Sequence, residues 1–356
     1  MSRPRSVPGL WTGVAAGVVG GAVLLADLLA LDRTYPFVGT TAWRPQASVV
    51  AAAAAFAMAT RRELRPAAVS LGTVSAVGMT LAARRMPGPA ATSTTGEAVS
   101  ILTFNALRGR ADAGRLADVV RHERPDLVVL TEAGCGFRDR LMPCVDGLGY
   151  RAWGSTGTGV RESRGVVLLA SPRAGGLRVR VGYDMHYRHL HATGGLLGSR
   201  RLFAVHATAP RDRARAADWR RDLAVVSRWC HADPAPIIVG DLNATLDHSA
   251  LRAALGGCRS AAAGRRRGRQ GTYPAGLPRG FGIQIDHVLV PAATLTTRFE
   301  VLDLLGSDHR AVLVGLQLPE VDQDSERRAS SRSGQRRAPH LHDGKATRAD
   351  TSGSTR

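Results

Sequence analysis

The chain of 356 residues predicts an α/β domain that follows an apolar, helical N-terminal region. Six apolar segments of strand length each carry a polar side chain near one end, and two longer segments between them have helical periodicity. Polar groups at strand ends are typical of catalytic sites in α/β proteins. Long Ala-rich apolar stretches before residue 84 predict the separate N-terminal region.

The N-terminal region, residues 1–84, contains about three apolar stretches that we interpret as transmembrane helices. Leu10–Leu31 has a single charge, Asp27, and is long enough to cross a bilayer. Ala47–Thr60 and Ala67–Ala83 are shorter. A signal peptide is the main alternative for the first stretch, and a hairpin of core helices is the alternative for the other two.

Positive charges set an orientation for these stretches. Arginines precede the first stretch at Arg3–Arg5 and separate the second from the third at Arg61–Arg65. The positive-inside rule places both groups in the cytoplasm, so the chain after Ala83 is expected on the outer side of the cell membrane. Arg84 and Arg85 oppose this orientation slightly.

The first part of the domain contains two predicted strands and one helix. Ser100–Ala106 alternates between polar and apolar residues, and Asn105 is its second-last residue. Gly114–Glu123 has helical periodicity. Pro125–Ala133 has the continuous apolar character of a buried strand and carries Glu132 near its end.

The middle part contains a strand, a helix and a second strand. Arg201–Pro210 is a predicted strand that carries His206, and Ala216–His231 has helical periodicity. Ile237–Thr245 follows as an apolar strand with Asp241 and Asn243 two residues apart at its end. Because side chains alternate along a strand, these two side chains are expected on the same side of the chain.

The last part supplies two further strands. Phe281–Val290 holds Asp286 and His287 inside an apolar run, and Gly306–Leu318 has Asp308 and His309 just before a terminal strand. Adjacent residues on a strand point to opposite faces, so His287 is expected to be structural when Asp286 is functional. Tyr273, in the preceding segment GTYPAGLP, either shapes a pocket or belongs to a simple turn.

Six short motifs in this order resemble the endonuclease/exonuclease/phosphatase superfamily, which contains the DNase I-like nucleases and the sphingomyelinases. They are TFNA, LTEA, VHATAP, VGDLNAT, IDHVLV and SDHRAV. The resemblance implies a four-layer α/β sandwich, in which two mixed sheets pack face to face with helices outside. It covers residues 99–318, which leaves 85–98 as a linker.

The resemblance also implies Mg²⁺ as the cofactor, with Mn²⁺ as a substitute. Hard oxygen ligands suit Mg²⁺, which takes one or two carboxylates and keeps several waters. By resemblance, Glu132 is the principal metal ligand, Asn105 lies beside it, and Asp308 is a further ligand.

The remaining motif residues acquire catalytic roles from the same resemblance. Asp241 resembles the residue that orients or deprotonates the attacking water, and Asn243 resembles a donor to the phosphate. Asp286 and His309 resemble an Asp–His pair in which the carboxylate fixes the imidazole tautomer. His206 resembles the histidine that contacts the phosphate and protonates the leaving group.

The net charge of +19 does not define the substrate. Lys345 is the sole lysine in the sequence, and arginine supplies the rest of the positive charge. Part of this charge lies in the run Arg265–Arg269 and part in residues 319–356, which are rich in Ser, Arg, Asp and Gly and are predicted to be disordered. A basic protein can bind lipid headgroups or wall polymers as readily as nucleic acid.

The four cysteines, Cys135, Cys144, Cys230 and Cys258, all lie in the domain. An even number outside the cytosol permits disulfides, and three connectivities remain open. Four buried thiols in a cytoplasmic enzyme are the alternative. No metal-binding cysteine spacing is present in the sequence.

Together these features predict a Mg²⁺-dependent phosphoesterase at the outer face of the cell membrane. The expected substrate is a phosphomonoester, pyrophosphate or phosphodiester of a lipid or of the envelope. Small membrane-anchored actinobacterial members of the superfamily, including a teicoplanin-resistance membrane protein, are similar in layout. A membrane-anchored extracellular nuclease, acting on nucleic acid, is one alternative. A catalytically inactive binding module is another, although the intact set of site residues opposes it.

Overall fold

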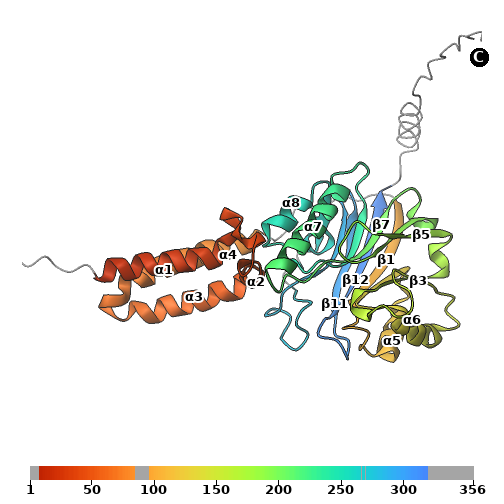
Figure 1. Cartoon of the computed structure of the whole chain (residues 1–356), viewed down its shortest axis with the longest axis horizontal. Coiled ribbons are helices and arrows are strands. Elements are labelled where there is room, and N and C mark those ends of the chain that lie inside the picture. The colour runs from red at the N-terminus through yellow and green to blue at the C-terminus, as the bar shows by residue number, and fades with distance from the viewer. Residues whose placement is uncertain (1–7, 85–95, 266, 269, 320–356) are drawn as a thin grey trace, which may run out of the picture. The chain divides into compact units, whose positions relative to one another are not determined.

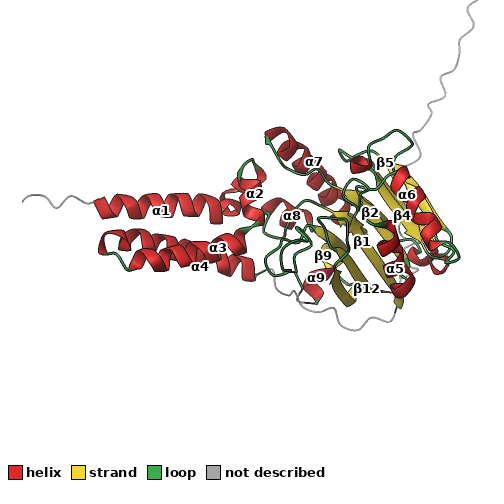
Figure 2. Ribbon diagram, turned by 90° about the horizontal axis from the view of Figure 1, so that it is seen from below, coloured by secondary structure: helices red, strands yellow, loops and turns green. Residues whose placement is uncertain are grey.

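The computed structural model describes residues 8–84, 96–265, 267–268 and 270–319. Within the domain, two six-stranded sheets contain both parallel and antiparallel neighbours. Helices lie on the outer faces of these sheets (Figures 1 and 2). The predicted α/β fold with two mixed sheets is confirmed. The predicted tail, 319–356, lies outside the described residues except for Pro319, and so does most of the predicted linker, 85–98.

The first sheet has the strand order β11-β12-β1-β2-β4-β3. Its central strands β1 and β2 run parallel, while the other neighbours pair antiparallel. The strands are β1 (Gly96–Asn105), β2 (Leu127–Thr131), β3 (Arg151–Gly154), β4 (Val166–Ala170), β11 (Leu295–Leu302) and β12 (Ala311–Pro319). Since β1 begins at Gly96, the domain starts slightly before the predicted boundary at residue 99.

The second sheet repeats this plan, with the order β5-β6-β7-β8-β10-β9. Here β7 and β8 are the parallel pair, and the other neighbours are antiparallel. The strands are β5 (Leu177–Gly182), β6 (His189–Gly194), β7 (Leu202–His206), β8 (Ile237–Asp241), β9 (Cys258–Ser260) and β10 (Asp286–Pro291).

The core between the two sheets forms because alternate residues of each strand point to the same face. Ile101 of β1 and Val239 of β8 belong to the buried cluster that both sheets share. Their neighbours point the other way and pack against helices. Leu102 contacts the cluster of the helices α5 and α6, whereas Ile238 lies in the cluster of α7 and α8. The domain therefore has the four layers that the sequence predicts.

The helices outside the sheets are amphipathic, and each buries its apolar side. Leu116 of α5 and Phe137 of α6 are fully buried on the first sheet, and Trp219 of α7 and Leu251 of α8 are fully buried on the second. Asp112 caps α5 and Asp212 caps α7 through a backbone N–H three residues later. The domain helices are α5 (Ala113–Glu123), α6 (Cys135–Leu141), α7 (Arg213–Cys230), α8 (Ser249–Ala254) and α9 (Ala261–Gly264).

Short 3₁₀ helices connect several of these elements. They are η1 (Ala26–Leu29), η2 (Leu31–Arg33), η3 (Arg62–Leu64), η4 (Met142–Val145), η5 (Glu162–Arg164), η6 (Pro172–Ala174) and η7 (Gly195–Leu197).

The N-terminal region is helical, with α1 (Pro8–Leu24), α2 (Phe37–Ala42), α3 (Arg44–Ala59) and α4 (Arg65–Ala83). Among the described residues, the helical stretch Arg62–Ala83 is long and apolar enough to cross a membrane, while Trp11–Leu24 is apolar but shorter. The bundle of three transmembrane helices thus stays a prediction.

The first predicted span, Leu10–Leu31, is not one continuous helix. α1 ends at Leu24, and η1 and η2 follow as separate short turns. The break coincides with Asp27, whose carboxylate is buried and paired with Arg44 and with Arg252. A buried carboxylate is stable only when its charge is compensated, and this pairing requires the chain to leave the apolar helix.

A buried polar network joins the N-terminal region to the domain. The guanidinium of Arg44 bonds both Asp27 and Asp247, and all three side chains are almost fully buried. Asp32 accepts hydrogen bonds from the Ser249 backbone N–H at 2.5 Å and from its hydroxyl at 2.8 Å. The contacts of Arg44 with Asp247 and of Asp32 with Ser249 connect residues more than 200 positions apart, so the N-terminal region packs against the start of α8.

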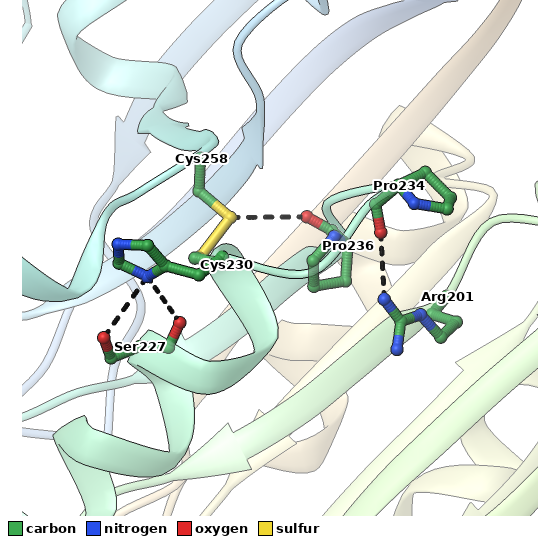
Figure 3. Close-up of a disulfide and its surroundings, with 7 residues drawn as sticks. Arg201, Ser227, Cys230, Pro234, Pro236 and Cys258 are labelled. Atoms are coloured by element: carbon green, nitrogen blue, oxygen red, sulfur yellow. Dashed lines mark hydrogen bonds between the residues drawn. A yellow bond between two sulfur atoms is a disulfide. The ribbon is translucent and has the colours of Figure 1, made fainter.

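A disulfide ties the end of α7 to β9. It joins Cys230 to Cys258, whose Cα atoms lie 5.3 Å apart (Figure 3). Cys135 and Cys144 are free thiols. The sequence leaves three connectivities open because disulfide pairing depends on which loops the fold brings together.

Candidate functional site

The pairing of the strands places the predicted site residues side by side. In the second sheet, His206 is in register with Asp241, and Asp241 is in register with Asp286. In the first sheet, Asn105 is in register with Thr131, the residue before Glu132. The ends of five strands from two sheets therefore meet at one edge of the sandwich.

Asp241 lies at the centre of this edge and is almost fully buried. Its Oδ1 accepts the backbone N–H of Asn243 at 2.8 Å, and its Oδ2 accepts the Asn105 amide at 3.0 Å. The contact from Asn105 crosses between the two sheets. It couples the carboxylate of one sheet to the strand end of the other.

His309 and Asp286 form the predicted pair. The Nδ1 atom of His309 lies 2.9 Å from Oδ2 of Asp286, and both residues are buried. The Nε2 atoms of His309 and of His206 each lie 4.0 Å from Oδ2 of Asp241. The imidazoles of His206 and His309 are therefore equally distant from the same carboxylate oxygen of Asp241.

These contacts shift the pKa values of the site. Burial, together with the nearby charge of Asp286, raises the pKa of Asp241 to about 7. Burial acts to lower the pKa of His309, but the Asp286 carboxylate outweighs it and raises that pKa to about 9. Burial also opposes ionisation of Asp286, yet the His309 cation holds its pKa below the usual value. At neutral pH, His309 and Asp286 are therefore an ion pair.

His206 has the opposite character from His309. Burial, reinforced by the charge of His309, lowers the pKa of His206 to about 4, so its imidazole is neutral at neutral pH. Tyr187 stacks on it with ring centroids 5.2 Å apart. The Nδ1 atom of His206 is buried and has no hydrogen-bond partner among the described residues.

Two site residues adopt left-handed backbone conformations. Glu132 has φ +50° and Asn243 has φ +47°. Asn tolerates this region because its side chain bonds locally, but Glu rarely adopts it. The amide of Asn243 donates to the carbonyl of Ala207 at 2.9 Å, and Glu132 accepts the N–H of Arg108 at 2.9 Å. Such strain is concentrated at functional sites, where the surrounding structure holds it.

The three predicted metal ligands offer the oxygen donors that Mg²⁺ requires. Glu132 supplies a partly exposed carboxylate, Asn105 an amide oxygen, and Asp308 a carboxylate. The Oδ1 atom of Asp308 is buried and has no hydrogen-bond partner among the described residues, as expected for an oxygen that awaits a cation. In chemical type these donors suit Mg²⁺, and the Asn105 amide oxygen also accepts the Leu107 N–H at 2.9 Å.

A second group of potential ligands differs from the predicted set. Among the described residues, Asp241, Asp286 and His309 have ligand atoms within 4.8 Å of one another. We regard this group as an acid–base cluster because His309 already bonds Asp286 and carries a positive charge at neutral pH. The positive charge of His309 would repel a metal ion bound there.

Two further residues support the site: Thr272, which was not predicted from the sequence, and Ser307, which lies in the SDHRAV motif but was assigned no role. Thr272 accepts the backbone N–H groups of Ile285 and Asp286 through its hydroxyl at 3.1 and 3.2 Å. Ser307 donates to the carbonyl of Asn105 at 2.7 Å. A Thr or Ser in a loop has no distinctive sequence signal.

The segment before β10 also differs from the predicted strand. That strand began at Phe281, whereas β10 begins at Asp286. Residues 281–285 instead form a loop, in which the Ile283 N–H donates to the Tyr273 carbonyl at 2.7 Å. The centroid of the Tyr273 ring lies 5.0 Å from that of the His309 ring, so this residue contacts the catalytic pair. His287 bonds the carbonyl of Ala244 at 2.8 Å, as expected of a structural residue.

A cleft of about 630 Å³ opens at this edge of the sandwich. Glu132, His206 and Tyr187 line it, together with several arginines. Its volume lies within the range of about 300–1,000 Å³ that is typical of small-molecule sites.

Comparisons with known proteins agree with this architecture. A family model described as "Endonuclease/Exonuclease/phosphatase family" matches residues 102–309. No curated protein matches the chain in sequence.

Similar solved structures include an endonuclease/exonuclease/phosphatase from Beutenbergia cavernae, with 21% identity over 63% of this chain and 72% of that chain, and a TM-score of 0.46. A mannosyl-6-phosphatase from Bacteroides thetaiotaomicron has 14% identity over 62% of this chain and 100% of that chain, with a TM-score of 0.46. D. rerio TDP2 complexed with single strand DNA product has 14% identity over 62% and 99%, with a TM-score of 0.49.

The opposed charge states of the two histidines can be measured by NMR titration of their ring resonances. We expect His309 to stay charged until about pH 9 and His206 to stay neutral until about pH 4. Replacing Asp286→Asn should lower the pKa of His309, because the carboxylate is the principal cause of its increase. Equal pKa values for the two histidines, or no change in the variant, would contradict the site geometry.

The shift of His309 also has a defined effect on stability. Its pKa rises on folding from 6.5 to about 9. Its contribution to the free energy of unfolding is therefore fully present below pH 6.5 and is lost as the pH rises through 9.

Proposed function

This chain belongs to the endonuclease/exonuclease/phosphatase family, and we propose that it is a Mg²⁺-dependent phosphoesterase acting on a lipid or envelope substrate at the outer face of the cell membrane. One observation carries the chemical part of the proposal. His206 and His309, one neutral and one charged, each lie 4.0 Å from the same oxygen of Asp241. A phosphate group placed between them would meet a base, a cation and a neutral donor.

The charge states of Asp241, His309 and His206 determine the role of each residue in the proposed reaction. Asp241 has a pKa of about 7, so near neutral pH it can remove a proton from the attacking water. The His309 cation stabilises the negative charge that develops on the phosphorus oxygens, and Asp286 keeps the imidazole charged and oriented. The neutral His206 acts as a hydrogen-bond donor to the phosphate or its leaving oxygen.

The other residues position the substrate and the cofactor. One N–H of Asn243 bonds Ala207, so the second N–H is the donor that we assign to the phosphate. Glu132, Asn105 and Asp308 would hold Mg²⁺. When bound, the ion supplies Lewis-acid stabilisation of the phosphate oxygens.

Two observations support a location outside the cytoplasm. The Cys230–Cys258 disulfide is typical of proteins in oxidising compartments. The arginine-rich turn at 61–65 between α3 and α4 suits a cytoplasmic loop. The contacts between the N-terminal region and the domain keep the site near that region, which favours a substrate anchored in the bilayer.

The proposed chemistry predicts metal-dependent hydrolysis by the full chain in detergent. Bis-p-nitrophenyl phosphate should be hydrolysed with Mg²⁺ or Mn²⁺ and not after chelation. Replacing Asp241→Asn should reduce kcat by about 100- to 10,000-fold, because the general base is lost while the shape is kept. Product absorbance measures this rate.

Asp118→Asn is the matched control, since Asp118 lies exposed on α5 and pairs with Arg121. It should leave kcat unchanged. The phosphoesterase proposal fails if neither metal supports hydrolysis and if the wild type and Asp241→Asn behave alike. A panel of phospholipids, polyprenyl phosphates and DNA then compares substrates, and cleavage confined to DNA would favour the nuclease instead.

The membrane orientation predicts which introduced cysteines react in intact cells. In a chain whose free thiols Cys135 and Cys144 are replaced by Ser, an impermeant maleimide should label Asp118→Cys in the domain. Glu63→Cys in the turn between α3 and α4 should react only after permeabilisation. Both positions are exposed in the structure. Labelling of Glu63→Cys alone in intact cells would place the domain in the cytoplasm.

A further inference from the structure

The cleft beside the catalytic residues is unusually basic. We call it the arginine recess and define its basic wall by five side chains. They come from the connection between β1 and α5, the connection between β3 and β4, and the segment that leads from β7 into the first turn of α7. They are Arg108, Arg161, Arg164, Arg211 and Arg215. The loops are distant in sequence, so the fold gathers these cations around one opening that contains Glu132 and His206.

The carboxylates in the recess do not neutralise these arginines. Glu162 accepts the backbone N–H groups of Gly134 at 2.5 Å and of Gly136 at 2.9 Å. Asp212 accepts the N–H of Arg215 at 2.8 Å, and Glu132 accepts that of Arg108. Each acidic group is therefore bonded to backbone N–H groups and forms no ion pair with these arginines among the described residues. Five guanidinium groups face three carboxylates, so the recess keeps an excess of positive charge.

Arginines elsewhere in the domain behave differently. Arg173, Arg298 and Arg310 each pair with one or two carboxylates. Within the described residues, no such ion pair involves Arg108, Arg161, Arg164 or Arg211, and Arg215 has only a 4.0 Å contact to Asp218. Other arginines of the domain, such as Arg178 and Arg180, also lack ion pairs among the described residues. The recess differs from them because the fold gathers five arginine side chains around one opening.

We propose that the arginine recess is a second anion-binding subsite and that the substrate carries a second phosphate group close to the one that is hydrolysed. This inference deepens the proposed function and rests on it. Arginine forms strong, charge-assisted bonds to phosphate oxygens, and several in one recess match a group with two or more negative charges. The reacting phosphate lies on the floor beside His206 and Glu132, and the second lies against the arginines.

A compact diphosphate-type group fits the recess better than a nucleic-acid strand. Proteins that bind single strands stack successive bases on several aromatic rings. The described lining of the recess contains one aromatic ring, Tyr187, which already stacks on His206. The other side chains that line it are polar or charged apart from Ala209.

Binding of two phosphonates to the full chain in detergent tests this subsite by calorimetry with excess Mg²⁺. We expect methylenediphosphonate to bind at least about tenfold more tightly than methylphosphonate, the gain expected from additional charge-assisted bonds. In the double variant Arg161→Gln and Arg164→Gln this preference should disappear. The matched control, Arg178→Gln with Arg180→Gln on β5, should retain it.

The binding experiment has three outcomes that would contradict part of the proposal. Equal binding of the two phosphonates, or a preference that survives in the recess variant, overturns the second subsite. Tighter, recess-dependent binding of a short single-stranded oligonucleotide overturns the compact diphosphate in favour of nucleic acid. Because binding needs no turnover, a chain that prefers the diphosphonate but hydrolyses no phosphoester would refute the proposed function and keep the subsite.

An independent set of contacts links the N-terminal region to the catalytic pair. Gln46, at the start of α3, donates its side-chain amide to the carbonyls of Phe281 at 3.1 Å and Gly282 at 3.0 Å. Ala42 and Trp43 pack with Ile283 in a small apolar cluster that also contacts Tyr273.

The loop that these residues hold supports the catalytic pair directly. Its Tyr273 ring contacts the His309 ring, and its Thr272 hydroxyl bonds the backbone of Asp286. The neighbouring Arg310 bonds four carbonyls of the segment 271–277. We infer that Trp43 and Gln46 are positioning residues for the Asp286–His309 pair, although they lie outside the matched family region.

Variants of the full chain in detergent test this second inference. Trp43→Ala and Gln46→Ala should lower kcat for bis-p-nitrophenyl phosphate by about 10- to 100-fold with little change in KM, the scale expected when catalytic groups are misplaced. Trp43→Phe should restore kcat, and Trp11→Ala, an exposed tryptophan of α1, is the control. An unchanged kcat, or a change confined to KM, would refute the inference.

Discussion

The structure of the site depends on the burial of three interacting charges in one small space. Asp241, Asp286 and His309 lie within 4.8 Å of one another and are shielded from water. Two carboxylates at this distance repel each other, and burial increases the cost of each charge. The His309 cation makes the arrangement stable, and the amide of Asn105 completes it from the other sheet. The face-to-face packing of the sheets is therefore a condition for the chemistry and not only a scaffold for it.

The backbone conformation near the site is a second constraint on its geometry. Glu132 and Asn243 follow the ends of β2 and β8 and turn sharply into left-handed conformations. Gly240, just before Asp241, has φ +137°, and a Cβ atom there would lie 2.0 Å from the carbonyl oxygen of Val205. Only glycine fits at that position. The close contact between β7 and β8 brings His206 and Asp241 together, so one glycine determines the spacing of two site residues.

The sequence was most informative where local pattern and chemistry coincide. Each polar residue at the end of an apolar strand was found at one edge, because strand ends are visible as a change from apolar to polar residues. Edge strands such as β5 were not predicted, since Leu177–Gly182 alternates with arginine and has exposed positions. Asp286 was expected inside a strand but begins one, because hydrogen bonds within the preceding loop outweigh its apolar composition.

Features that depend on distant contacts could not be predicted from the sequence. The partner of Asp27 is Arg44, but their environment is completed by Asp247, just before α8, and by Arg252 of α8. Pairing of Cys230 with Cys258 likewise follows from the contact between α7 and β9. The arginines of the recess come from three separate segments of the chain, and no local signal distinguishes them from the many other arginines.

The buried network around Arg44 has a consequence for the order of assembly during synthesis. Arg44 leaves the ribosome about 200 residues before its partner Asp247. Asp27 can pair with Arg44 as soon as both are made, but Asp247, Ser249 and Arg252 come about 200 residues later. The N-terminal helices therefore complete their contacts with the domain only after the chain around α8 has been made.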